Sequence, residues 1–206
     1  MVINKEEIIM KKIPVGISGR HAHLTQEHID ILFGEKDYKL TVLKELSQPG
    51  QYACEEKIDV VSPEGKVLAG VRILGPARPA SQVEISQSDA IRFKFNAPVR
   101  SSGDVKNSGK ATLIGPKGQV EIEEGVIIAD RHIHFSLEEA KEFGVTDREV
   151  VSIKVGGVKP GILDNVLCRV NSQFVLDCHL DTDDGAAFML KTGDTVELVK
   201  KYEIIK

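Results

Sequence analysis

Two segments of the chain repeat one pattern. Residues 19–35 read GRHAHLTQEHIDILFGE, and residues 130–145 read DRHIHFSLEEAKEFGV. Each contains Arg-His-x-His, an apolar residue, a hydroxyl residue that can cap a helix, an acidic helical segment and a glycine. Chance gives on the order of 0.01 copies of Arg-His-x-His in a chain of this composition. The repeat therefore predicts two related, β-rich halves of about a hundred residues each.

Both repeats predict a short helix directly after the histidines. The first helix is expected to begin after a Thr25 cap and to end before Gly34. The second is expected to begin after Ser136, which forms the signature of a capping box with Glu139, and to end before Gly144.

The rest of the chain is rich in short runs of β-forming residues. Residues 57–74 and 110–129 each contain two such runs around a Pro- and Gly-containing turn, which predicts two hairpins. Short strands at close spacing are typical of small barrels or sandwiches. Four further strands are expected within residues 150–155, 165–170, 173–180 and 195–205.

The composition excludes several classes of protein. The 206 residues, 41% of them hydrophobic, suffice for a sizeable core. A net charge of −4 and an aromatic content of 5% argue against a nucleic-acid binder. No apolar run has the length of a membrane span, and the N-terminus is no secretory signal. Three cysteines without a CxxC motif fit a reducing compartment, so a cytoplasmic protein is expected.

Four of the six histidines lie in the two repeats, as His21 and His23 and as His132 and His134. Side chains two residues apart on an extended segment point to the same face, so each pair can converge on one point. Zinc binds imidazole nitrogens and takes three or four protein ligands. Two nearby metal ions or one fully enclosed ion would both fit these four side chains. The alternative is that they only form hydrogen bonds within the core.

The run LDCHLDTDDG contains a fifth histidine, His179, which is either a core residue or a further ligand. The acidic residues after it do not form an EF-hand loop. Gly185 comes one place too early for such a loop, and Thr192 occupies the position of the bidentate Glu. His28, the sixth histidine, is expected on the surface of the first helix.

Two charged residues between the hairpins are further candidates. Glu84 lies between Val83 and Ile85, so it is either solvated on the outer face of a strand or paired on the inner face. Spacing alone favours the solvated position. Arg78 lies on a loop with two prolines and can hold an anion with two hydrogen bonds, or it is ordinary surface charge.

Taken together, six segments identify a resemblance: GISGRHAHLT, QPGQYACEE, VRILGPARPASQVEIS, SSGD, GVIIADRHIH and HLDTD. From Ile13 to Leu198 the chain resembles the PduL-type phosphotransacylases, or phosphate propanoyltransferases. The resemblance implies a mainly β fold of two small β-barrel domains, related by internal duplication, with short capping helices and the active site between them. Domain 1 would contain residues 9–19 and 130–206, domain 2 residues 20–129, and residues 1–8 would form a short N-terminal segment.

The same resemblance implies the chemistry. A zinc-dependent enzyme would interconvert acyl-CoA (propanoyl-CoA, acetyl-CoA or both) and phosphate with acyl phosphate and CoA, by direct attack of phosphate on a zinc-polarised thioester. It would use two zinc ions per chain and form a homo-oligomer, without nucleic-acid or membrane partners. Arg78 would bind phosphate in the active site. His21 and His23 would hold one zinc ion; the implied ligands of the second are Glu84, His132, His134 and His179.

Family members inside bacterial microcompartments carry an amphipathic N-terminal helix as an encapsulation signal. Here only a weak apolar stripe precedes the fold. Two alternatives therefore stay open: a location inside a microcompartment, with shell or lumen partners, or a housekeeping role in forming acetate. A two-zinc thioesterase or hydrolase is the alternative function, followed by a non-catalytic metal-binding scaffold. Six ligands for two ions leave open coordination positions, which favours catalysis. The residues of the apolar stripe are Val2, Ile3, Ile8, Ile9 and Met10.

Overall fold

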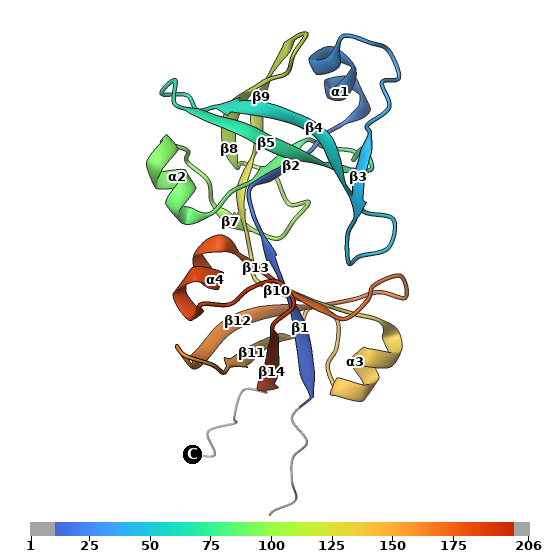
Figure 1. The fold of residues 1–206 in the computed structure, drawn as a ribbon, viewed down its shortest axis with the longest axis vertical. Coiled ribbons are helices and arrows are strands. Elements are labelled where there is room, and N and C mark those ends of the chain that lie inside the picture. Colours follow the sequence, from blue (N-terminus) through green and yellow to red (C-terminus); the bar gives the residue numbers. More distant parts are fainter. Residues whose placement is uncertain (1–10, 200–206) are drawn as a thin grey trace, which may run out of the picture. The chain divides into compact units, whose positions relative to one another are not determined.

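The structure is a computed structural model that describes residues 11–199, which fold into two compact units (Figure 1). The central unit comprises Ser18–Asp130 and Asp181–Asp183. The terminal unit comprises the described residues through Ile17, then Arg131–Leu180, and those from Asp184 on. The expected N-terminal stripe and the end of the last expected strand, from residue 200 on, lie outside the described residues.

The terminal unit is built around a closed barrel of six strands in the order β1-β13-β10-β12-β11-β14. Its largest fully buried side chains include Ile13, Ile133, Phe135 and Ile153, which belong to one apolar core. The strands are β1 (Lys12–Ser18), β10 (His132–Phe135), β11 (Val150–Val155), β12 (Gly161–Val170), β13 (Asp177–Asp181) and β14 (Thr195–Val199). Helix α3 (Leu137–Phe143) follows β10 along the chain, and α4 (Thr182–Phe188) follows β13.

The central unit contains a second barrel, because β8 pairs with both β4 and β9 and so closes the order β4-β5-β2-β6-β9-β8. Strand β3 extends the sheet beyond β4, and β7 pairs with β9. The strands are β2 (His21–His23), β3 (Val42–Glu45), β4 (Tyr52–Val61), β5 (Val67–Gly75), β6 (Gln82–Glu84), β7 (Val99–Arg100), β8 (Gly109–Ile114) and β9 (Gln119–Ala129). Helices α1 (Gln26–Phe33) and α2 (Gln87–Phe93) follow β2 and β6 along the chain. These two barrels with short helices confirm the predicted mainly β fold.

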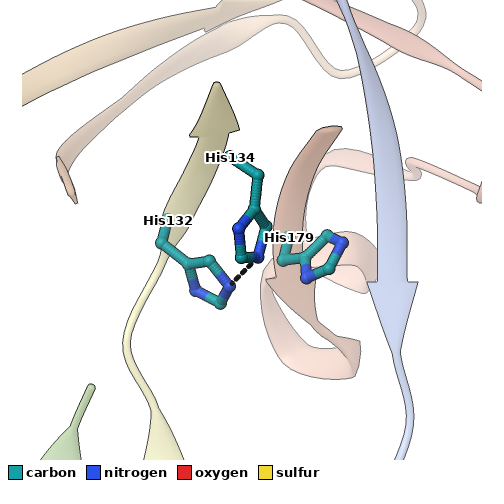
Figure 2. A group of neighbouring side chains, drawn as sticks. All are labelled: His132, His134 and His179. Carbon is teal, nitrogen blue, oxygen red and sulfur yellow. Dashed lines mark hydrogen bonds between the residues drawn. The ribbon is translucent and has the colours of Figure 1, made fainter. Parts of the chain in front are cut away.

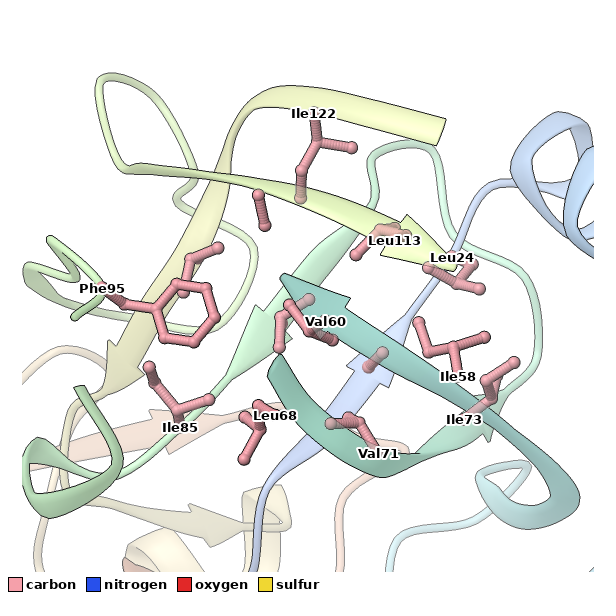
Figure 3. Packing of buried hydrophobic residues seen from close by; sticks show 14 of the residues in the cluster. Leu24, Ile58, Val60, Leu68, Val71, Ile73, Ile85, Phe95, Leu113 and Ile122 are labelled. Atoms are coloured by element: carbon pink, nitrogen blue, oxygen red, sulfur yellow. The ribbon is translucent and has the colours of Figure 1, made fainter. Parts of the chain in front are cut away.

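The two hairpins are also confirmed, as β4–β5 and β8–β9. A bulge in the first hairpin adjusts which side chains enter the core. Strand β5 has one residue more than β4 between the pairs Ile58↔Val71 and Val60↔Leu68. Gly70 has a φ of 66°, which favours glycine, and its N–H donates to a side-chain oxygen of the β4 residue opposite the bulge. As a result, the four paired side chains all point into the core shown in Figure 3.

Core packing in the central unit predicts a large loss of stability for Leu113→Ala. Leu113 is fully buried among the residues of Figure 3, so its removal leaves a cavity. We expect the free energy of unfolding in urea to fall by about 2–5 kcal/mol. Ile114→Ala is the matched control, because the next side chain on the same strand is 38% exposed. Equal losses for the two variants would contradict the assigned strand faces.

The two predicted helices, α1 and α3, are confirmed with their caps. The Thr25 side chain accepts from the N–H of His28, and Ser136 and Glu139 form the full capping box. Helices α2 and α4 were not predicted. The strand expected within residues 173–180 is present as β13, but it begins only at Asp177. None of the helices within residues 11–199 is long and apolar enough to cross a membrane.

Candidate metal centres

The first candidate centre contains His21 and His23, which both lie on β2. Alternation along the strand places Ala22 in the apolar core and the two histidines on the opposite face, where they are nevertheless buried. The Nδ1 of His21 lies 2.9 Å from the carbonyl oxygen of Gly19, and the Nδ1 of His23 lies 3.2 Å from that of Leu74. Because a carbonyl only accepts, Nδ1–H must be the donor in both rings, which leaves Nε2 as the ligand atom.

Glu84 is the third member of this first group. Strand β6 pairs antiparallel with β2 and places Glu84 opposite His21, with its Oε2 3.4 Å from the Nε2 of His21. Its side chain is buried, so the solvated position favoured by spacing was wrong. Strand register places Glu84 beside His21 and His23, whereas the family resemblance implied that it binds a metal ion with the second set of histidines. The possible ligand atoms of His21, His23 and Glu84 all lie within 4.8 Å of one another.

The charges in the first group suit metal binding. Burial lowers the pKa of His23 to about 3, and the positive charges of His21 and Arg78 act in the same direction. Burial also acts to lower the pKa of His21, but the Glu84 carboxylate outweighs it and raises that pKa above its ordinary value. Burial acts to raise the pKa of Glu84, yet His21 lowers it well below its usual range. Near neutral pH, Glu84 is therefore ionised and His23 is neutral, which are the forms that bind metals, whereas a metal ion has to displace the proton that the Glu84 carboxylate favours on His21.

A hydrogen-bond network surrounds the Glu84 carboxylate. Its Oε1 accepts from the Nε2 of Gln82 at 2.6 Å and from the Oγ of Ser102 at 2.7 Å. Ser102 in turn accepts from Nη1 of Arg78 at 3.2 Å. Arg78 is half-buried, so the candidate phosphate residue lies beside the first group rather than on an isolated surface loop. Sequence reasoning missed Gln82 and Ser102 as site residues, although Ser102 lies in the SSGD segment.

The second candidate centre contains His132 and His134 from β10 and His179 from β13 (Figure 2). The antiparallel register places His132 opposite His179. The ring centroid of His179 lies 5.1 Å from that of His132 and 4.8 Å from that of His134. The structure thus brings His179, whose role was open from its local sequence, into a group whose ligand atoms lie within 4.8 Å of one another.

The side chains of the second group fit a divalent metal ion such as zinc. The Nε2 atoms of His132 and His134 lie 3.1 Å apart, close to the roughly 3.3 Å that separates two nitrogens bound tetrahedrally to zinc. The Nδ1 of His134 is buried and has no hydrogen-bond partner among the described residues. Burial, with the charges of His132 and His179, lowers the pKa of His134 to about 2. The buried imidazole is therefore neutral and able to act as a ligand.

The remaining histidine and the cysteines lie outside both groups. His28 is half-buried rather than on the surface as expected, and its Nδ1 lies 2.8 Å from the Oγ of Ser81. All three cysteines are buried and free. Burial raises the pKa of Cys54 to about 11 and that of Cys178 further above its ordinary value. These two thiols are thus kept protonated, which is unsuited to nucleophilic catalysis.

Comparison with known proteins identifies the family. A family model described as phosphate propanoyltransferase matches residues 14–191, which include both groups. A phosphate propanoyltransferase of Thermotoga maritima is 46% identical over 196 residues, covering 93% of this chain and 92% of the relative. Proteins of the same name from Lachnoclostridium phytofermentans (44% identity, 91% and 87% covered) and Clostridioides difficile (41%, 95% and 95%) are similar over comparable lengths. The chain therefore belongs to the phosphate propanoyltransferase family.

Proposed function

We propose that the protein is a zinc-dependent phosphate acyltransferase. It would interconvert acyl-CoA and inorganic phosphate with acyl phosphate and free CoA. The observation that carries this proposal is the family match over residues 14–191, which spans two groups of largely buried side chains that could bind metals. Propanoyl is the acyl group named for the relatives, and acetyl is the second candidate because it differs by a single methylene.

Each group would hold one zinc ion, giving two per chain. Three protein ligands are typical of catalytic zinc sites, whereas structural sites use four. Bound zinc would supply a Lewis acid for the thioester carbonyl and a partner for the CoA thiolate. The proposed ligands are His21, His23 and Glu84 in the first group and His132, His134 and His179 in the second.

Arg78 would bind and orient the phosphate. A guanidinium offers a planar fork of N–H donors that matches phosphate oxygens, and the hydrogen bond to Ser102 holds one arm of this fork in place. Its charge already acts on His21 and His23, which places it electrostatically beside the first group. A phosphate held by Arg78 would therefore lie close to these ligands.

The reaction needs no covalent enzyme intermediate. A phosphate oxygen forms a bond to the carbonyl carbon of the thioester, the carbon–sulfur bond breaks, and its electron pair leaves with sulfur as the CoA thiolate. Phosphate is already an anion at neutral pH, so a strong general base is not required. The buried Cys54 and Cys178, whose pKa values are raised, support this direct transfer.

The test is the dependence of CoA release on phosphate. With acetyl-, propanoyl- and butanoyl-CoA as substrates, we expect thiol release only when phosphate is present, with one acyl phosphate formed per CoA. The relative rates then identify the preferred acyl group. Equal release without phosphate would show that water is the attacking group and that the protein is a thioesterase. Metal binding without any CoA release would instead favour a non-catalytic scaffold.

A further inference from the structure

The two candidate centres are built on the same strand pair. In the central unit, β2 pairs antiparallel with β6, and His21 lies opposite Glu84. In the terminal unit, β10 pairs antiparallel with β13, and His132 lies opposite His179. Glu84 and His179 therefore occupy equivalent positions, each as the third ligand candidate beside an Arg-His-x-His strand.

Ion pairs extend this equivalence into the helices that follow. The residue five places after Glu84 is Asp89, whose Oδ2 lies 3.4 Å from Nε of Arg20. The residue five places after His179 is Asp184, which accepts two hydrogen bonds from Arg131 at 2.7 and 2.8 Å. In each unit, the arginine of the Arg-His-x-His motif thus pairs with the acidic residue five places after the third ligand candidate. The matching contacts support an internal duplication of the whole strand–strand–helix arrangement.

The equivalence of the two strand pairs also relates two buried polar residues that have no role in the reaction proposed above. Gln82 lies opposite His23 and Asp177 lies opposite His134, each two residues before the third ligand candidate. They are 1% and 6% exposed. A buried polar side chain is costly unless it is hydrogen-bonded, so the hydrogen bonds of each one indicate what it stabilises. Besides its contact with Glu84, Gln82 donates to Oγ of Ser102 and accepts from the N–H of Gly103, both at 2.8 Å.

Both residues contact the third ligand with complementary chemistry. The amide of Gln82 donates to Oε1 of Glu84 at 2.6 Å. The carboxylate of Asp177 lies 3.0 Å from Nε2 of His179, which must donate because an ionised carboxylate only accepts. A carboxylate ligand is thus paired with a donor, and an imidazole ligand with an acceptor.

We propose that Gln82 and Asp177 are equivalent positioning residues, each of which fixes the orientation of the third ligand in its group for metal binding. Gln82 engages Oε1 of Glu84, so Oε2 remains on the side of His21. Asp177 holds the proton of His179 on Nε2, so the lone pair of Nδ1 is left for the metal. The proposal presupposes the metal-dependent function proposed above.

The packing around Asp177 supports this role. A Cβ atom added to Gly16 on β1 would lie 3.3 Å from Oδ2 of Asp177 and 3.3 Å from Cδ2 of His179. Because Gly16 has no Cβ, strand β1 leaves space for the Asp177–His179 pair, and a larger residue at position 16 would press against both side chains. Within this space, the hydrogen bond to Asp177 selects one orientation of the His179 ring.

The proposal is tested by measuring Co²⁺ affinity in competition with a chelator, one group at a time. Gln82→Met is combined with His134→Ala, and Asp177→Leu with His23→Ala, so that only the group under test is intact. Relative to the single His variant, we expect affinity to fall 10- to 100-fold in each case. Asp59→Leu is the matched control, because Asp59 accepts a structural hydrogen bond from Gly70 without contacting a ligand.

The outcomes separate a positioning role from a structural one. Asp177→Asn keeps an acceptor oxygen and should restore most of the affinity lost in Asp177→Leu. Affinities unchanged from the single His variants would overturn the proposal. A wild-type chain that binds no Co²⁺ would refute the proposed metal-dependent function instead.

A second measurement does not depend on metal or on the folding of any variant. ¹⁵N NMR of the metal-free wild-type protein, at a pH where imidazoles are neutral, reports which nitrogen of His179 carries the proton. We expect Nε2–H. An Nδ1–H tautomer would show that Asp177 does not set the orientation of His179, whatever the affinities of the variants.

Discussion

Replacing His134 by Ala is expected to remove the metal ion from the second group and to lower kcat by roughly 10²- to 10³-fold, the equivalent of several kcal/mol of transition-state stabilisation. His134 lies close to both of its partners, with its Nε2 3.1 Å from that of His132 and its ring centroid 4.8 Å from that of His179. Its pKa of about 2 shows that burial keeps it neutral, and two histidines without it provide too few ligands for tight binding. The measurements are metal content per chain and kcat for CoA release.

The first group should respond in the same way to His23→Ala, because His23 is buried and neutral and its Nδ1 is held by a backbone carbonyl. A chelator should abolish the activity of the wild-type protein, and added zinc should restore it. His28→Ala is the matched control, since His28 forms a hydrogen bond with Ser81 outside both groups and should retain both ions and the wild-type rate. A His134→Ala protein with two ions and full activity would contradict the assignment of the second centre.

The helices that were predictable from the sequence have local signals at both ends. Helix α3, for example, begins at a capping box and ends at Gly144 with a φ of 65°. Helix α4 has no such signals, because its DTDDG start resembles a loop and Gly185 lies in its interior. That glycine gives close packing, since a Cβ atom there would lie 3.0 Å from Cδ1 of Ile17, which would have to shift. Helix α2 did carry a usable signal, the cap of Ser86 with Asp89 three residues later.

In the candidate centres, too, the residues that could be predicted are those with a local sequence signal, whereas the others depend on strand pairing. The paired histidines were visible because residues two apart on one strand share a face. The third ligand depends on which strand pairs with the histidine strand and in which register, and local periodicity contains neither. This is why local spacing favoured a solvated position for Glu84; its grouping with the second set of histidines was implied by the family resemblance. The segments 82–89 and 177–184, QVEISQSD and DCHLDTDD, share only their final Asp, so their equivalence emerges from register alone.

Arg78→Ala is expected to retain both metal ions and to lower kcat/KM for phosphate by roughly 10- to 100-fold, which corresponds to the loss of one charge-assisted interaction of about 1.5–3 kcal/mol. The physical reason is that the guanidinium provides charge and a donor fork for phosphate, whereas the metal ligands are other side chains. Because phosphate would be bound less well, its KM should rise, while the KM for acyl-CoA should change little. The measurement is initial CoA release across phosphate concentrations, together with metal content.

Two further variants separate the geometry of Arg78 from its charge. Arg78→Lys keeps the positive charge but loses the planar fork, so it should recover only part of the phosphate affinity. Arg92→Ala removes a positive charge from an exposed position on α2 and should leave the KM for phosphate unchanged. If Arg78→Ala instead lost metal while its KM for phosphate stayed constant, the Arg78–Ser102–Glu84 network would act through the ligand carboxylate. The phosphate would then have to be bound by other residues.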